Sequence, residues 1–176
     1  MADMYIGRQP VLDGEQNVWG YELLFRSNAE NRASFDDAQQ ATSQVILNAL
    51  LEFGLERVVG DAKALVNLPR DFLLGEQADL LPPQQVVLEV LEDVVVDEAV
   101  VSGVRRLRDV GYMMALDDFA FEAHWEPLLE MADLIKVEVP AIAPEVRDGL
   151  RQRFKDIKRR GTRLLAEKVE THEEFE

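Results

Sequence analysis

Two short runs with β-sheet character open the chain. They span Tyr5–Leu12 and Val18–Arg26 and are separated by Asp13-Gly14-Glu15-Gln16. An Asp-Gly pair between two such runs is a strong short-range signal for a β-hairpin. We therefore expect the chain to begin with an antiparallel pair of strands.

After this pair, short apolar runs alternate with amphipathic helical patterns. Ser34 and Asp37 resemble a capping box, and apolar residues recur at helical spacing from Ala38 to Phe53, just before Gly54. Residues 97–110 form a second helical pattern that Gly111 ends. Further helical stretches are predicted over 125–131 and 144–161, and further strands over 64–68, 86–91, 112–116, 134–139 and 163–169.

This alternation predicts the fold class. Nearly continuous apolar strands between amphipathic helices are typical of parallel strands covered by helices, in an open α/β sheet or a (β/α) barrel. The pattern gives about seven strands, whereas a closed barrel needs eight. We therefore interpret residues 1–176 as one α/β domain that is incomplete at its C-terminal end.

Amino-acid composition limits the classes of partner and ligand that we expect for this chain. The formal net charge is −15, which disfavours nucleic acid as a partner because such binding depends on basic contacts to phosphate. The chain has no cysteine and only two histidines, so any metal would be held mainly by oxygen. Neither a signal peptide nor a membrane-spanning run is visible, and we expect a cytoplasmic protein without a membrane partner.

Polar side chains interrupt the predicted strands near their C-terminal ends. Because these ends form one mouth in parallel α/β folds, we expect the side chains to converge. Clustered carboxylates repel one another unless cations compensate them, and oxygen donors select hard ions such as Mg²⁺ or Mn²⁺. Two-metal sites typically perform displacement at phosphorus, so phosphodiester hydrolysis is our hypothesis. The residues concerned are Glu22, Asn67, Glu89, Asp117, Asp118, Lys136 and Glu167.

The same positions lie in motifs that resemble those of EAL domains. The motifs follow one another in order over essentially the whole chain, and the segment from Arg8 to Arg26 looks most like the branch in which an EAL domain precedes an HDOD domain. They are Gln9-Pro10-Val11, Gly20-Tyr21-Glu22-Leu23-Leu24-Phe25-Arg26, Val66-Asn67-Leu68, Leu88-Glu89-Val90-Leu91-Glu92, Leu116-Asp117-Asp118-Phe119, Ile135-Lys136-Val137 and Ala166-Glu167-Lys168-Val169-Glu170-Thr171.

The resemblance implies a TIM-like (β/α)₈ barrel with an antiparallel first strand, and a phosphodiesterase that linearises cyclic di-GMP. In this chain the last barrel strand and any HDOD domain would be absent. One metal ion would be held by Glu22, Asn67, Glu89 and Asp117, and the second metal or its water by Asp117, Asp118 and Glu167. The resemblance further implies that Lys136 orients the water, that Glu167 is the general base, that Gln9 and Arg26 contact ligand, and that Glu92 and Glu170 play supporting roles.

Several residues depart from the family pattern. The family's Glu-Ala-Leu signature is Glu22-Leu23-Leu24 in this chain. Ala120-Phe121-Glu122 replaces a Gly-Thr-Gly loop, whose glycines make its backbone flexible. Glu138 replaces an aspartate and Lys168 a glycine, and the last strand with its Gln-Gly pair is absent. These departures predict impaired turnover of cyclic di-GMP.

Two alternatives remain open at this point. The chain could be a catalytically inactive EAL-like module that senses ligand or contacts a protein partner or a second copy. It could also be a scaffold whose strand-end acids are relics and whose segment around Phe121 and Trp125 binds another protein.

Overall fold

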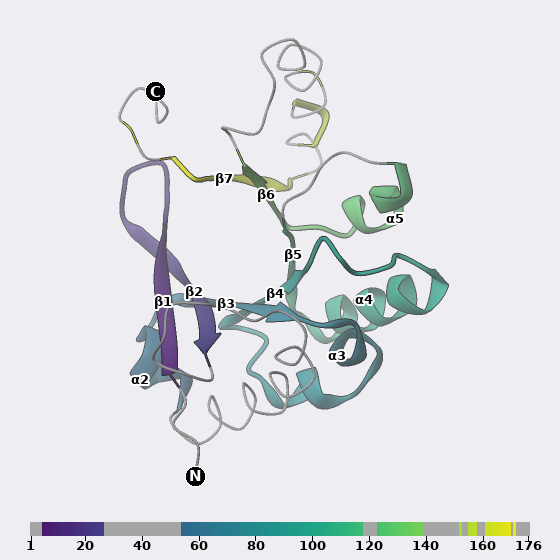
Figure 1. The fold of residues 1–176 in the computed structure, drawn as a ribbon, viewed down its shortest axis with the longest axis horizontal. Helices are drawn as coiled ribbons and strands as arrows, with labels where there is room; N and C mark the ends of the chain where they lie inside the picture. The colour runs from purple at the N-terminus through teal and green to yellow at the C-terminus, as the bar shows by residue number, and fades with distance from the viewer. Residues whose placement is uncertain are drawn as a thin grey trace.

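A seven-stranded mixed sheet forms the centre of the molecule (Figure 1). The computed structural model describes residues 5–26, 54–117, 123–138, 152, 155–157, 161–169 and 171. The strands pair in sequence order, β1 and β2 antiparallel and all later neighbours parallel. Their bounds are Tyr5–Leu12 (β1), Val18–Arg26 (β2), Lys63–Leu68 (β3), Val86–Val90 (β4), Met113–Leu116 (β5), Leu134–Glu138 (β6) and Arg163–Glu167 (β7).

The predicted N-terminal hairpin is confirmed. The Asp13 carboxylate accepts hydrogen bonds from the backbone N–H groups of Glu15 and Asn17, both at 2.9 Å, and so stabilises the loop. The left-handed position in this loop is Gln16, with φ of 65°, and not Gly14. The Asp-Gly pair thus marked the correct place, although the turn is built by the aspartate side chain.

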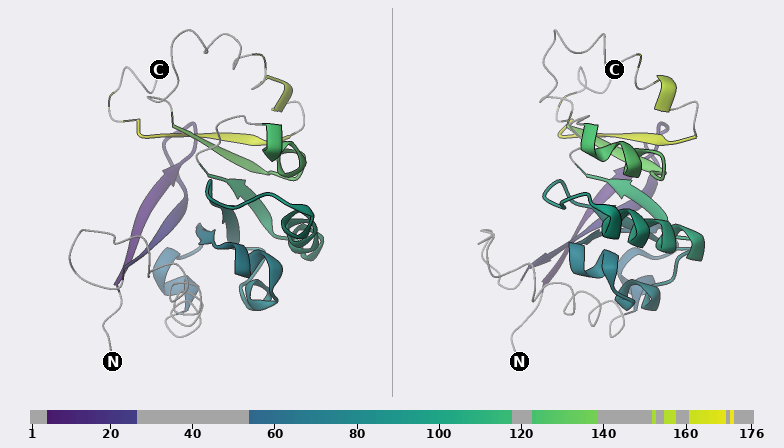
Figure 2. Two further views of the ribbon diagram at one scale, coloured as in Figure 1. Left: turned by 45° about the vertical axis from the view of Figure 1, so that its right-hand side comes forward. Right: turned by 90° about the vertical axis from the view of Figure 1, so that its right-hand side faces the viewer.

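The sheet curls into part of a barrel (Figure 2). Strands β2 and β7 are not neighbours in the sheet, yet the guanidinium of Arg163 on β7 lies 5.8 Å from the ring centroid of Trp19 on β2. A flat sheet could not bring these side chains together. The prediction of an incomplete barrel with an antiparallel first strand is therefore confirmed.

Helices cover the outer face of this sheet. The helix predicted over 97–110 is confirmed, and the predicted segment 125–131 is helical over 125–129, where η2 ends and α5 follows. Three short helices, α2, α3 and η1, were not predicted, because four or five residues are too few to show a period. The helices are Leu55–Val59 (α2), Arg70–Leu74 (α3), Gln77–Leu80 (η1), Glu98–Val110 (α4), Ala123–Trp125 (η2) and Glu126–Leu129 (α5).

Some predicted elements lie outside the described residues. The helix predicted over 38–53 is one of them, together with its capping box. Of the segment predicted over 144–161, the described residues are 152 and 155–157, which are helical, and Gly161, which lies in a turn. Within the described part of the chain, no helix is both long and apolar enough to span a membrane.

Alternation along the strands divides the core into two layers. The larger layer lies between sheet and helices and includes Val66, Leu88 and Ile135, each 0% exposed. The smaller layer lies on the inner face and comprises Val11, Leu65, Val87, Ala115 and Leu134. Successive strand residues point to opposite faces, so the same strands supply both layers.

Helix α4 is fixed at both ends and along its length. The Asp97 side chain caps its N-terminus by accepting a hydrogen bond from the backbone N–H of Val100 at 2.9 Å, and Gly111 ends it in the left-handed conformation. In the middle, Gly103 faces α3 so closely that a β-carbon would lie 2.2 Å from the backbone oxygen of Leu73. Glycine at this position therefore sets the spacing of the two helices.

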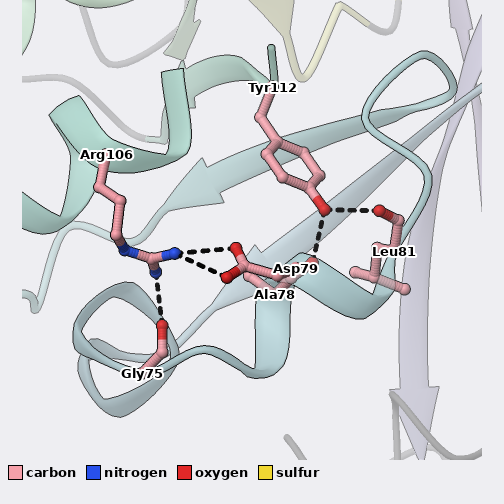
Figure 3. Close-up of polar contacts among 6 residues, drawn as sticks. All are labelled: Gly75, Ala78, Asp79, Leu81, Arg106 and Tyr112. Atoms are coloured by element: carbon pink, nitrogen blue, oxygen red, sulfur yellow. Dashed lines mark hydrogen bonds and ion pairs between the residues drawn. The ribbon is translucent and has the colours of Figure 1, made fainter. Parts of the chain in front are cut away.

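The connection between α3 and β4 is held by two side chains (Figure 3). Arg106 on α4 binds both carboxylate oxygens of Asp79, at 2.8 and 2.9 Å, and also donates to the carbonyl of Gly75. The Tyr112 hydroxyl lies within hydrogen-bond distance of the carbonyl oxygens of Ala78 and Leu81. These bonds satisfy backbone groups in a segment with little regular structure.

Candidate functional site

A buried lysine lies at the centre of four carboxylates. The side chain of Lys136, on β6, is 1% exposed, and its ammonium contacts acids from four different parts of the sheet. Its Nζ atom lies 2.7 Å from Asp117 Oδ1, 3.0 Å from Glu167 Oε1 and 3.3 Å from both Glu22 Oε1 and Glu89 Oε1. The structure thus brings together five residues that sequence reasoning had expected to converge.

Strand register explains the convergence. Residues separated by an even number of positions on a strand share a face, as do residues paired across neighbouring strands. Glu22 pairs with Leu65, two residues before Asn67, and Asn67 pairs with Glu89. The inner face that carries Leu65 therefore also carries all three polar side chains.

The same rule identifies the residues of the inner face on the remaining strands. Glu89 pairs with Ala115, which stands two residues before Asp117, and Ala115 pairs with Leu134, two residues before Lys136. Lys136 in turn pairs with Leu165, two residues before Glu167. Relative to its cross-strand partner, the polar residue thus shifts by two positions along the chain at β3, β5 and β7, as expected when tilted strands wrap around a barrel axis.

Glu89 is the most deeply buried acid of the cluster, with 0% of its surface exposed. Burial raises the pKa of Glu89 to about 8; the Lys136 ammonium lowers it, while Glu22 and Asp117 raise it further. At neutral pH the Glu89 carboxyl is therefore mainly protonated. Burial likewise raises the pKa of Glu167, and its contact with Lys136 only partly opposes this.

Lys136 remains charged despite its burial. Burial by itself would lower the pKa of Lys136, but the Glu89 and Asp117 carboxylates outweigh that effect and raise it. Four ionised carboxylates around one ammonium carry a net charge of −3, and protonation of Glu89 reduces it to −2. The cluster therefore attracts a further cation.

The donor set suits a hard divalent ion. The side-chain oxygen of Asn67 and both carboxyl oxygens of Glu89 are buried without a hydrogen-bond partner, which is costly for polar atoms. Carboxylate and amide oxygens are the ligands that Mg²⁺ and Mn²⁺ prefer. In the described residues, however, no three acids or histidines are grouped as a ready metal site, because the carboxylates converge on the Lys136 ammonium instead.

The remaining predicted residues lie around this cluster or outside the described part. Gln9 is exposed on β1, directly opposite Glu22, and Arg26 pairs in register with Tyr5 at the other end of the hairpin. Glu92 is exposed in the loop after β4. Asp118, Glu170 and the segment Ala120-Phe121-Glu122 lie outside the described residues.

Two side-chain contacts after the strand ends were missed by sequence reasoning. Lys168 and Glu138 had each been identified as a departure from a family motif, but their ion pair was not predicted. Arg70, the first residue of α3, binds the segment after β4 through the Asp97 carboxylate at 2.6 Å and the Val95 carbonyl at 2.8 Å. Both contacts link residues at least 25 positions apart, and a single sequence carries no signal for such pairs.

The raised pKa of Glu89 predicts how stability depends on pH. Folded Glu89 keeps its proton up to about pH 8, whereas the unfolded chain releases it near 4.5, so proton binding favours the folded state between these values. We expect the metal-free protein to lose stability as pH rises from 4.5 to about 8, and Glu89→Gln to remove much of this loss. Urea unfolding of both proteins in EDTA at several pH values measures this dependence of stability on pH.

Glu56→Gln is the control, since Glu56 is an exposed carboxylate on α2. This substitution should leave the slope of stability against pH at the parent's value. A parent protein whose stability rises with pH over this window, or a Glu89→Gln variant with the parent's slope, would contradict the prediction.

Comparison with known proteins adds sequence relatives and fold relatives. No family model matches the chain. Two curated proteins are each 33% identical to it over 177 residues: the cyclic di-GMP phosphodiesterase CdgJ of Vibrio cholerae, covering 99% of this chain and 40% of CdgJ, and the uncharacterized protein YuxH of Bacillus subtilis, covering 98% and 42%. The chain thus spans less than half the length of these relatives.

A solved structure shares the fold. The manganese and cyclic di-GMP complex of BlrP1 from Klebsiella pneumoniae superposes with a TM-score of 0.74 at 22% identity, covering 98% of this chain and 51% of BlrP1. At this identity the likeness concerns the fold. Other solved structures of similar fold are described as EAL domains and EAL enzymes.

Proposed function

Because this chain belongs to the EAL domain family, we propose that it is a metal-dependent phosphodiesterase domain that hydrolyses cyclic di-GMP to the linear dinucleotide. The observation that carries the proposal is the convergence of Glu22, Glu89, Asp117 and Glu167 on Lys136, within 2.7–3.3 Å. A general scaffold would gain nothing from burying four acids around one ammonium, because their repulsion and desolvation cost stability.

Divalent metal is part of the proposal. Glu22, Asn67, Glu89 and Asp117 would hold one Mg²⁺ or Mn²⁺ ion, and Asp117, Asp118 and Glu167 would serve a second ion or its water. The oxygen donors, the buried oxygens of Asn67 and Glu89 that lack a hydrogen bond, and the net negative charge support this assignment. The bound metal would supply an activated water and stabilise charge developing on the phosphate oxygens.

Glu167 and Lys136 would act on the attacking water. Glu167 is partly exposed, and its raised pKa makes it a better proton acceptor than an ordinary glutamate. Lys136 would orient the water and hold Glu167, since its ammonium already lies 3.0 Å from that carboxylate. Gln9, opposite Glu22, and Arg26 would contact the ligand, and a guanidinium suits a phosphate because it donates two parallel hydrogen bonds. Glu92 and Glu170 would play supporting roles.

We further propose that turnover is impaired. The sequence Ala120-Phe121-Glu122 replaces flexible glycine positions directly after Asp117-Asp118-Phe119, which supports a reduced rate rather than a change of substrate. In the whole protein, the segment from Arg8 to Arg26 supports an arrangement in which an HDOD domain follows. An inactive module that senses the ligand or binds a protein partner or second copy is the alternative outcome of the test.

Turnover is tested by incubating the protein with cyclic di-GMP and Mg²⁺ or Mn²⁺ and separating the products by chromatography. We expect linear dinucleotide from the parent and roughly a hundredfold less from Glu167→Gln, the typical contribution of a general base. Glu56→Gln should match the parent, because Glu56 is exposed on α2. Binding of cyclic di-GMP without any product, at any protein concentration, would exclude the enzyme and favour the inactive module.

A further inference from the structure

Two residues that depart from the family motifs contact each other. Lys168 follows β7 directly, Glu138 ends β6, and their side chains form an ion pair. Their exposed fractions are 58% and 30%, so the pair lies at the rim rather than in the buried cluster. A lysine in place of glycine and a longer acid in place of aspartate thus make one joint feature.

The backbone of Lys168 supports a role for this pair. Its φ is 56°, a left-handed conformation that is unfavourable for residues other than glycine. In the part of the chain that the structure describes, Gln16 in the hairpin loop is the other non-glycine residue with positive φ. A strained position next to a functional residue persists only where surrounding contacts hold it. The ion pair with Glu138 is such a contact.

Register places the pair beside Glu167. Glu138 and Glu167 are cross-strand partners, and Glu138 stands two residues after Lys136 on the same face of β6. Two carboxylates are thus available at the end of this strand pair, where like charges repel. Lys168 binds Glu138, and Lys136 binds Glu167 at 3.0 Å.

We propose that Lys168 and Glu138 are a positioning pair, which fastens the chain after β7 to β6 and so holds the Glu167 carboxylate against Lys136. The pair also keeps Glu138 from competing for that ammonium. This inference rests on the proposed function, because it assigns Glu167 the role given above. Neither residue of the pair touches the reacting atoms.

Four variants test the pair. Lys168→Met removes the charge, and Lys168→Gly removes the charge together with the backbone strain. If activity falls in both variants, the ion pair is the cause. Lys168→Arg keeps the charge, and the double variant Lys168→Glu with Glu138→Lys reverses it. We expect kcat to fall about tenfold in the first two with KM within twofold of the parent, since small misplacements of a catalytic group reduce rate steeply. We expect recovery in the last two.

Lys63→Met is the matched control. Lys63 joins β3 to the segment before β4, through a bond to the carbonyl of Gln84 at 2.6 Å, at the opposite end of the strands. Its loss should leave kcat at the parent value. An unchanged kcat in Lys168→Met, full activity in Lys168→Gly, or a rise in KM alone would overturn the proposal.

A second measurement separates this inference from the proposed function. If the parent shows no turnover, the proposed function fails, but hydrogen exchange at the end of β7 still tests the pair. We expect the amide of Glu167, which alternation from the Arg163 N–H directs toward β6, to exchange about fivefold faster in Lys168→Met than in the parent or in Lys63→Met, as for loss of a partly exposed ion pair. Equal exchange in all three proteins would overturn the positioning role.

Discussion

Replacing Lys136 with methionine should lower the free energy of unfolding of the metal-free protein by about 3–5 kcal/mol at pH 8, the usual cost of removing one partner from a buried charge pair. The four carboxylates around the Lys136 ammonium would then have no internal counter-charge. Methionine keeps a similar length and flexibility, so the effect isolates the charge. Urea unfolding in EDTA measures it.

The stability lost in Lys136→Met should depend on pH and on added metal. It should shrink on acidification, because protonated carboxyls no longer repel, and it should shrink on addition of Mn²⁺, because an ion that binds only the folded state stabilises it. Lys63→Met should cost only about 1 kcal/mol, since it removes one hydrogen bond near the surface. A Lys136→Met protein as stable as the parent at pH 8 in EDTA would contradict the central place given to this ammonium.

Replacing Gly103 with alanine should destabilise the fold by about 3 kcal/mol, at the upper end of the usual cost of overpacking. The new β-carbon would lie 2.2 Å from the backbone oxygen of Leu73, and backbone cannot move aside as a flexible side chain can. In an exposed helix the same substitution would stabilise by about 1 kcal/mol, so the expected sign is opposite to helix propensity. Urea unfolding measures this effect as well.

Ser102→Ala is the control for the helix itself. Ser102 is the exposed neighbour of Gly103 on α4, and its replacement should change stability by no more than about 0.5 kcal/mol. A Gly103→Ala protein as stable as the parent would mean that α3 and α4 can separate without loss, contrary to the packing observed. An intermediate loss would measure how far the two helices relax.

Much of the sheet could be predicted from local patterns. The bounds of β1 and β2 at the hairpin were correct, because the Asp13 side chain builds the loop that separates the two runs. Helix α4 was predicted because its cap, its apolar face and its terminal Gly111 agree. The short helices α2 and α3 were missed, since they are fixed by packing and not by a repeating pattern.

The site was predictable as a set of residues but not as an arrangement. Acids that interrupt apolar strands are unusual enough to mark Glu22 and Glu89, and the rule that strand ends meet placed them together. The position of Lys136 between all four acids depends on the tilt of the strands, which no local pattern encodes. The Lys168–Glu138 pair depends in addition on one left-handed residue.

The stepwise register of the inner face sets which changes of length the domain can accept. Deleting one residue inside β4 before Glu89 would turn its side chain toward the helices, whereas the same deletion in the hairpin loop beside Asp13 would leave every strand facing as before. Natural or engineered relatives of this domain should therefore differ in length at their loops, and conserve the count of residues within each strand.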